Sequence, residues 1–189
     1  SSVPTGWDLV ANRKRVITEM DQGLIDRVIE NYAKAAYHCL EAGFEMIMIH
    51  GAHGNLLAQF VSPATNKRTD KYGGSLKNRA RFVMELLEAI RARVGNRLAI
   101  EYRVSGSEMD PNGMQEAETI EFIKLIQDKI DLVHVSLGMI SGPQYIYHMA
   151  QPVYLPHNYN VERAAAIKKA IKIPVTCIGS IIDLATADS

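Results

Sequence analysis

Residues 44–50, FEMIMIH, form an almost unbroken apolar run that ends at a histidine. A strand with one face in water alternates apolar and polar residues, whereas a strand of a parallel sheet that is covered on both faces is apolar throughout. The run therefore predicts a buried parallel strand. Gly43 suits the left-handed turn that closes a preceding helix. That helix is expected to begin at Thr18, whose hydroxyl caps free backbone amides while Asp21 reaches back.

The same cycle of helix, apolar run and polar loop recurs along the chain. Helices are expected at 78–95, 116–128 and 161–171 (the last capped by Asn160), strands at 97–106, 131–138 and 173–180, and the start of another helix at 183–188. This alternation predicts an α/β fold with parallel strands. An open doubly wound sheet and a (β/α)8 barrel both fit, and both place ligands beyond the carboxyl ends of their strands.

The composition indicates one domain, 1–189, and gives no sign of a nucleic-acid or membrane partner. The chain is 47% hydrophobic, and its 21 basic residues balance 21 acidic ones, so nothing favours a nucleic acid or a membrane surface. The start of the sequence resembles no secretory signal, and two cysteines, Cys39 and Cys177, suit a reducing cytoplasm.

The first strand ends in HGAHG, residues 50–54, which places His50 and His53 beside two glycines. Two neutral imidazoles there could donate N–H bonds to one carbonyl or carboxylate oxygen of a substrate and polarise it. They could equally bind a metal, with a third ligand from Glu101, His134 or His148. The alternative without a functional role is that one histidine bonds to a backbone carbonyl and the other is exposed to solvent.

Two further groups follow later strands. Arg103 lies among apolar residues, so it needs a partner, either Glu101 on the same face of its strand or a bound anion or electron-rich ring. Gly179 and Ser180 form a turn between a strand and a helix start, where free amides could bind phosphate; an ordinary turn is the alternative. In the polar loop between residues 62 and 82, mutual ion pairing is expected among Arg68, Asp70, Arg79 and Arg81.

Residues 42–82, AGFEMIMIHGAHGNLLAQFVSPATNKRTDKYGGSLKNRARF, strongly resemble the Old Yellow Enzyme family of FMN-dependent ene-reductases, and in particular its enoate and 2,4-dienoyl-CoA reductase-like branch. The resemblance continues through YRVSG, VHVSLG and PVTCIGS and so covers nearly the whole chain. It implies a (β/α)8 TIM barrel, of which only about four βα units, strands four to seven, are present. It also implies FMN as cofactor and NAD(P)H as electron donor.

The resemblance also assigns roles to individual residues. His50 and His53 match the pair that holds the substrate's carbonyl oxygen near the flavin, and Arg103 matches the arginine beside the flavin N1 and C2 oxygen. Gly179 and Ser180 match the turn that meets the FMN phosphate, although other members often carry arginine or asparagine in place of the serine.

Asn55 departs from the family pattern, because many members have a tyrosine there that protonates the substrate's α-carbon. An amide cannot serve as that acid, so water, Tyr145 or Tyr147 would have to replace it.

The resemblance implies reduction of the C=C bond of an α,β-unsaturated carbonyl or enoate compound. Two rivals stay open: a metal-dependent barrel lyase or hydrolase that uses the histidine pair, and a non-catalytic fragment whose open barrel edges self-associate into a homo-oligomer.

Overall fold

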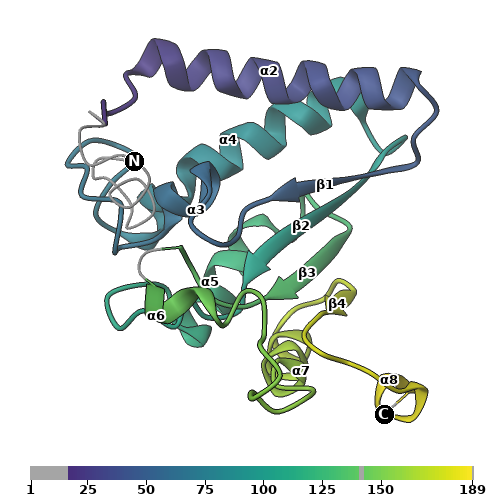
Figure 1. The fold of residues 1–189 in the computed structure, drawn as a ribbon. Helices are drawn as coiled ribbons and strands as arrows, with labels where there is room; N and C mark the ends of the chain where they lie inside the picture. Colours follow the sequence, from purple (N-terminus) through teal and green to yellow (C-terminus); the bar gives the residue numbers. More distant parts are fainter. Residues whose placement is uncertain (1–16, 141–142, 189) are drawn as a thin grey trace.

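A computed structural model of the protein describes residues 17–140 and 143–188. Helices and strands alternate along them (Figure 1). The elements are α2 (Gln22–Glu41), β1 (Met46–His50), α3 (Leu56–Val61), α4 (Leu76–Val94), β2 (Ala99–Ser105), α5 (Glu116–Ile126), β3 (Leu132–Ser136), α6 (Pro143–Ile146), α7 (Val161–Ala170), β4 (Val175–Cys177) and α8 (Leu184–Asp188). The α/β alternation predicted from the sequence is confirmed, and the short helices α3 and α6 add to it.

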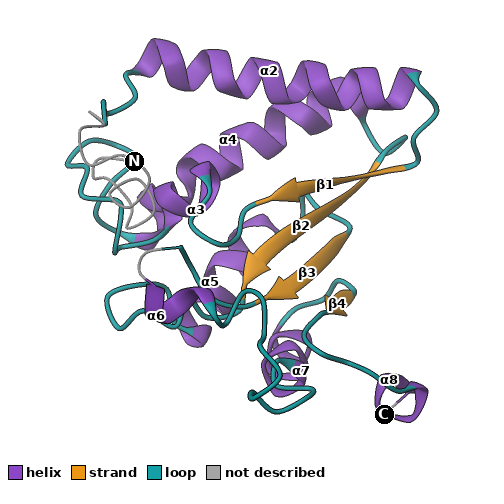
Figure 2. Ribbon diagram, in the orientation of Figure 1, coloured by secondary structure: helices purple, strands orange, loops and turns teal. Residues whose placement is uncertain are grey.

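The four strands form one parallel sheet in the order β1-β2-β3-β4 (Figure 2). Helix α2 packs on α4, α4 on α5, and α5 on α7, so the helices follow one another around the sheet in chain order. A doubly wound sheet reverses its strand order and carries helices on both faces, whereas a βα barrel adds each unit beside the last. The observed order is that of a barrel wall.

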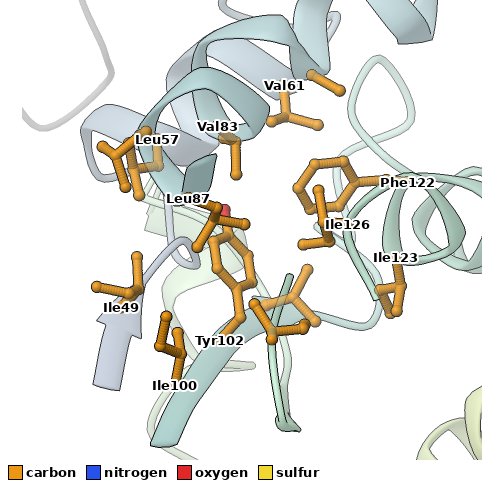
Figure 3. Packing of buried hydrophobic residues seen from close by; sticks show 14 of the residues in the cluster. Ile49, Leu57, Val61, Val83, Leu87, Ile100, Tyr102, Phe122, Ile123 and Ile126 are labelled. Atoms are coloured by element: carbon orange, nitrogen blue, oxygen red, sulfur yellow. The ribbon is translucent and has the colours of Figure 1, made fainter. Parts of the chain in front are cut away.

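The core lies between the sheet and this layer of helices (Figure 3). Ile49, Ile100 and Tyr102 point from β1 and β2 toward Leu87 and Phe122 of the helices. The apolar side of α4 that the sequence predicts is confirmed, since each of its members is fully buried: Phe82, Val83, Leu86, Leu87, Ile90 and Val94.

The opposite face of the sheet carries the polar residues and is open at β1. Met46 and Met48 are 49% and 44% exposed, although the sequence predicted a strand buried on both faces. That prediction is wrong because the helices cover only the side on which Ile49 lies; the side with the methionines has no comparable cover among the described residues.

Two predicted helix caps are corrected. Asp21, and not Thr18, is the N-cap of α2, and its carboxylate accepts a hydrogen bond from Leu24 N at 2.7 Å. Asn160 holds the N-cap position of α7, but its side chain makes no cap bond. Its Nδ2 donates instead to Val135 O and Ile178 O, at 3.0 and 3.1 Å, and so joins the ends of β3 and β4.

Ion pairs and hydrogen bonds hold the polar segment 62–82, which runs from the end of α3 into α4, but only one of the ion pairs joins two of the four residues predicted to pair with one another. Arg68 pairs with Asp70, as expected, and also donates to Met20 O at 2.9 Å. Arg79 pairs with Glu118 of α5, and Arg81 donates to the backbone at Lys71.

Cys39 and Cys177 are free thiols, each partly exposed. Within residues 17–140 and 143–188, no helix has both the length and the apolar character that crossing a membrane requires.

Candidate active site

The polar residues of the open sheet face gather at the carboxyl ends of three strands. His50 is in register with Arg103, and Arg103 is in register with His134. Residues paired across neighbouring strands point to the same side of a sheet, so these three side chains share the open face. Ser136 follows two residues after His134 and therefore lies on that face as well.

His53 reaches the same place from the loop after β1, where it has a left-handed backbone with φ of 64°. Such a conformation is strained for a residue with a Cβ and persists only when its surroundings hold it. Here His53 N donates to Ser105 Oγ at 3.2 Å, and His53 O accepts from Ile140 N at 3.1 Å. The ring centroids of His50 and His53 are consequently 5.2 Å apart, edge to face.

The surroundings of both histidines favour the neutral form of the ring. Burial, assisted by the charge of Arg103, lowers the pKa of His53 to about 4. Burial also lowers the pKa of His50, with further contributions from Arg103 and His134. A neutral imidazole offers one N–H donor and one acceptor nitrogen, so each ring can donate to a ligand.

Arg103 is bound to a serine and not to a carboxylate. Its Nη2 donates to Ser136 Oγ at 3.3 Å, and its Nε is buried with no hydrogen-bond partner among the described residues. Glu101, the structural partner considered from the sequence, binds His134 Nδ1 at 3.1 Å instead. The arginine therefore has N–H groups left to donate to a ligand. Burial lowers the pKa of its guanidinium.

Asn55 contacts one member of the histidine pair. It is the N-cap residue of α3 but makes no cap bond with its side chain. Its Nδ2 donates to His50 Nε2 at 2.9 Å and to Ala52 O at 3.2 Å. The residue that departs from the family pattern thus lies directly at the candidate substrate site.

Gly179 and Ser180 border a cavity of about 300 Å³ beyond the ends of β3 and β4. The cavity is lined by Ser136, Leu137, His148, Met149, Gln151, Asn160, Ile178, Gly179 and Ser180. Gly179 has a φ of 137°, and a Cβ there would lie 3.2 Å from Asn160 Cβ, so a side chain would crowd this wall. Ser180 has a φ of 55°, and its Oγ is 2.8 Å from His157 Nδ1.

The sequence pointed to no ligand-binding role for two residues of this cavity. Gln151 Oε1 and Asn160 Oδ1 are buried there without partners among the described residues; Asn160 was predicted only as a helix cap, and no local pattern signals Gln151. His148, considered only as a metal ligand, lines the cavity with its Nδ1 bonded to Tyr159. Tyr147, a candidate acid, is 49% exposed beside Tyr154.

The metal alternative lacks a third ligand in the described part of the chain, where no group of three or more His, Cys, Asp and Glu side chains is placed to hold an ion. Two of the ligands considered, Glu101 and His134, bind each other.

Parallel strands in chain order, with polar side chains gathered at their carboxyl ends, are the arrangement of a βα-barrel wall, a class of protein in which the carboxyl end of the barrel carries the site. Residues 4–189 match the model of the NADH:flavin oxidoreductase / NADH oxidase family, and the chain belongs to this family. Membership implies FMN as the cofactor and NADH or NADPH as the electron donor.

Two curated relatives illustrate the relationship. The chain is 35% identical over 182 residues to an NADH oxidase of Thermoanaerobacter brockii, matching 96% of this chain and 27% of that protein. It is 36% identical over 167 residues to an NADPH dehydrogenase of Clostridium acetobutylicum, matching 88% of this chain and 47% of that one. The chain therefore spans less than half the length of either relative.

Solved structures agree on the fold. A complex of 2-naphthoyl-CoA reductase with 2-naphthoyl-CoA superposes with a TM-score of 0.84 at 31% identity, covering 90% of this chain and 26% of the reductase. An Old Yellow Enzyme homologue from Zymomonas mobilis gives 0.70 at 26% identity, covering 92% of this chain and 46% of the homologue. The four βα units are thus part of a TIM barrel of the Old Yellow Enzyme type.

Proposed function

We propose that the protein is a flavin-dependent ene-reductase, or the central part of one, that reduces the C=C bond of an α,β-unsaturated carbonyl or enoate compound. One observation carries the proposal: two histidine rings lie with their centroids 5.2 Å apart at the carboxyl end of a barrel strand, where burial lowers the pKa of both. Family membership supports the redox chemistry, and the histidine pair supports the substrate class.

His50 and His53 would bind the substrate by its carbonyl oxygen. Hydrogen bonds to that oxygen draw electron density from the conjugated C=C bond and strengthen as the oxygen takes on the charge of an enolate. When bound, FMN would supply a hydride to the β-carbon of the C=C bond, and NADH or NADPH would restore the reduced flavin. The proton that completes the reduction at the α-carbon would come from water, Tyr145 or Tyr147, because the amide of Asn55 cannot supply it. Neutral rings suit the role of His50 and His53 because each still donates an N–H bond, and the N–H of a neutral imidazole is too weak an acid to pass its proton to the enolate oxygen.

The residues present fit FMN. Arg103 has a buried Nε that no described residue hydrogen-bonds, and a cation with free donors suits an electron-rich ring edge. In the cavity beside Gly179, the amide oxygens of Gln151 and Asn160 have no partner within residues 17–140 and 143–188, and they suit the hydroxyl groups of a polyol chain. Gly179 keeps this wall free of a side chain. We assign Arg103 and Gly179 to flavin binding on these grounds, and Ser180 because it lines the same cavity.

The substrate is expected to be a compound whose C=C bond is conjugated to a carbonyl group. The 2-naphthoyl-CoA named with the similar reductase carries a thioester carbonyl next to an unsaturated ring, and this supports acyl thioesters as one class to try. Simple enones and cinnamate-type enoates present the same oxygen to the two histidines.

The proposal is tested on the parent-length protein after reconstitution with FMN. We expect stoichiometric flavin bands in the visible spectrum, NAD(P)H-dependent reduction of cyclohexenone, and a spectral shift when a phenol binds. His50→Ala with His53→Ala should abolish the phenol shift and keep the flavin, whereas His38→Ala, on an exposed turn of α2, should change neither. A protein that takes up no FMN, or stoichiometric zinc that is lost in the double variant, would contradict the proposal.

A further inference from the structure

Ser136, the last residue of β3, joins the flavin side of the candidate site to the substrate side. Its Oγ is 3.3 Å from Arg103 Nη2 and 2.7 Å from His53 Nε2. The residue is only 2% exposed, so water does not compete for these contacts. A single hydroxyl therefore links the arginine to one of the two histidines, although the three residues come from three different segments of the chain.

The direction of these two bonds follows from counting hydrogens. A guanidinium only donates, so the serine oxygen accepts from Arg103. If His53 Nε2 also donated, the hydroxyl hydrogen of Ser136 would be buried without an acceptor among the described residues, which is the costly arrangement. The hydroxyl therefore donates to Nε2, and the neutral ring carries its hydrogen on Nδ1.

The other nitrogen of His53 is open to a ligand. No described residue hydrogen-bonds to Nδ1, and Nδ1 is not among the buried polar atoms that lack a partner, so it keeps contact with the surroundings. Hydrogen bonds to Ser105 and Ile140 hold the backbone of His53 and so fix the position of its Cβ, from which the ring extends. Ser136 fixes how the ring is protonated.

We propose that Ser136 is a positioning residue that holds His53 as the Nδ1–H tautomer and so makes Nδ1 the donor to the substrate oxygen. The inference rests on the proposed function, since it assumes that His53 binds a carbonyl oxygen. Arg103 adds to the effect: a cation that bonds to the serine oxygen makes its hydroxyl a stronger donor to Nε2, and this in turn makes Nδ1–H a stronger donor. The charge beside the flavin is thereby relayed to the substrate histidine.

The test uses the parent-length, FMN-loaded protein labelled with ¹⁵N-histidine. Long-range ¹H–¹⁵N spectra at neutral pH report which ring nitrogen of His53 is protonated, without any turnover. We expect Nδ1–H in the unaltered protein, a shift toward Nε2–H in Ser136→Ala, and phenol affinity weaker by about tenfold, the effect of one hydrogen bond. Ser136→Thr should restore both, because it keeps the hydroxyl and the adjacent cavity has room for a methyl group.

Ser105→Ala is the matched control, because Ser105 bonds the backbone of His53 and not its ring. We expect it to leave the Nδ1–H tautomer in place, and if Ser136→Ala does not fold, Ser136→Cys supplies a weaker donor of similar size. An Nε2–H ring in the unaltered protein, or an unchanged tautomer in Ser136→Ala, would overturn the inference. A tautomer that responds as expected in a protein without enone reduction would contradict the proposed function alone.

Discussion

The phenol oxygen of Tyr102 occupies the space in which a side chain on Gly51 would begin. An ideal Cβ on Gly51 would lie 2.0 Å from this oxygen and 2.2 Å from the ring carbon that bears it. Tyr102 is fully buried on β2, and its hydroxyl has no hydrogen-bond partner among the described residues. The glycine between the two histidines is therefore required by a ring on the neighbouring strand.

Gly51→Ala is expected to lower the free energy of unfolding by about 1–3 kcal/mol, the usual cost of overpacking a core. Tyr102→Leu in the same chain should recover part of the loss, because it removes the atoms that the new methyl group meets. Gly23→Ala is the control: its Cβ would meet only Asp21 Oδ1 at 3.6 Å, and alanine favours a helix by about 0.5–1 kcal/mol. Denaturant unfolding gives the free energy of unfolding of all three variants. An unchanged value for Gly51→Ala would show that the Tyr102 ring can move away from the new methyl group.

Glu108 makes stability depend on pH. Its Oε2 accepts from Ser62 Oγ at 2.6 Å and Met114 N at 2.7 Å, yet burial prevails and raises its pKa to about 7. Between about pH 4.5 and 7 the unfolded chain loses this proton while the folded chain retains it, so the free energy of unfolding falls as pH rises.

A shift of this size corresponds to at most about 3 kcal/mol. Glu108→Gln should remove that slope, because a glutamine does not titrate. Its amide oxygen can still accept the bonds from Ser62 and Met114, so the fold should be kept. Glu121→Gln, at an exposed position of α5, should keep the slope. Urea unfolding from pH 4.5 to 8 gives the comparison, and equal slopes in all three proteins would refute the prediction.

Arg103→Met is expected to make the bound flavin harder to reduce, because a cation near the ring stabilises its reduced, negatively charged form. The side chain is free for this role, since Glu101 is bound to His134. Arg103→Lys keeps the charge, so its flavin midpoint potential should lie between those of the unaltered protein and Arg103→Met. The midpoint potential of the parent-length protein is the measurement; an unchanged potential with only stability lost would leave Arg103 a structural residue.

Asn55→Tyr, in the intact enzyme, is expected to raise the rate of enone reduction by bound reduced flavin or to leave it unchanged. A phenol can supply the proton that an amide cannot, and general acid catalysis typically contributes about 10² to 10⁴ in rate. Asn55→Phe is the matched control, because it removes the bond to His50 Nε2 without adding an acid. Stopped-flow reoxidation of the flavin by cyclohexenone separates the two variants. A strong loss in both, with flavin still bound, would mean that Asn55 acts by holding His50 or the substrate.

The local pattern of the chain was sufficient to predict most of its secondary structure. A helix shows its buried side every three to four residues, so the apolar face of α4 was evident before the structure. Glycines and the apolar run before His50 located the end of β1. The alternation of helices and strands also predicted that the two histidines, Arg103 and the turn at Gly179 lie toward the carboxyl ends of strands.

Three features were decided only by the tertiary structure: which side of β1 is covered, which residue binds Arg103, and what the side chain of Asn160 does. The covered side depends on where the helices pack, and this left Met46 and Met48 exposed. Arg103 binds Ser136, a residue 33 positions away, and not Glu101, two positions away. Sequence periodicity reports the geometry of one segment, whereas these contacts depend on the register between strands, which hydrogen bonds between distant residues establish.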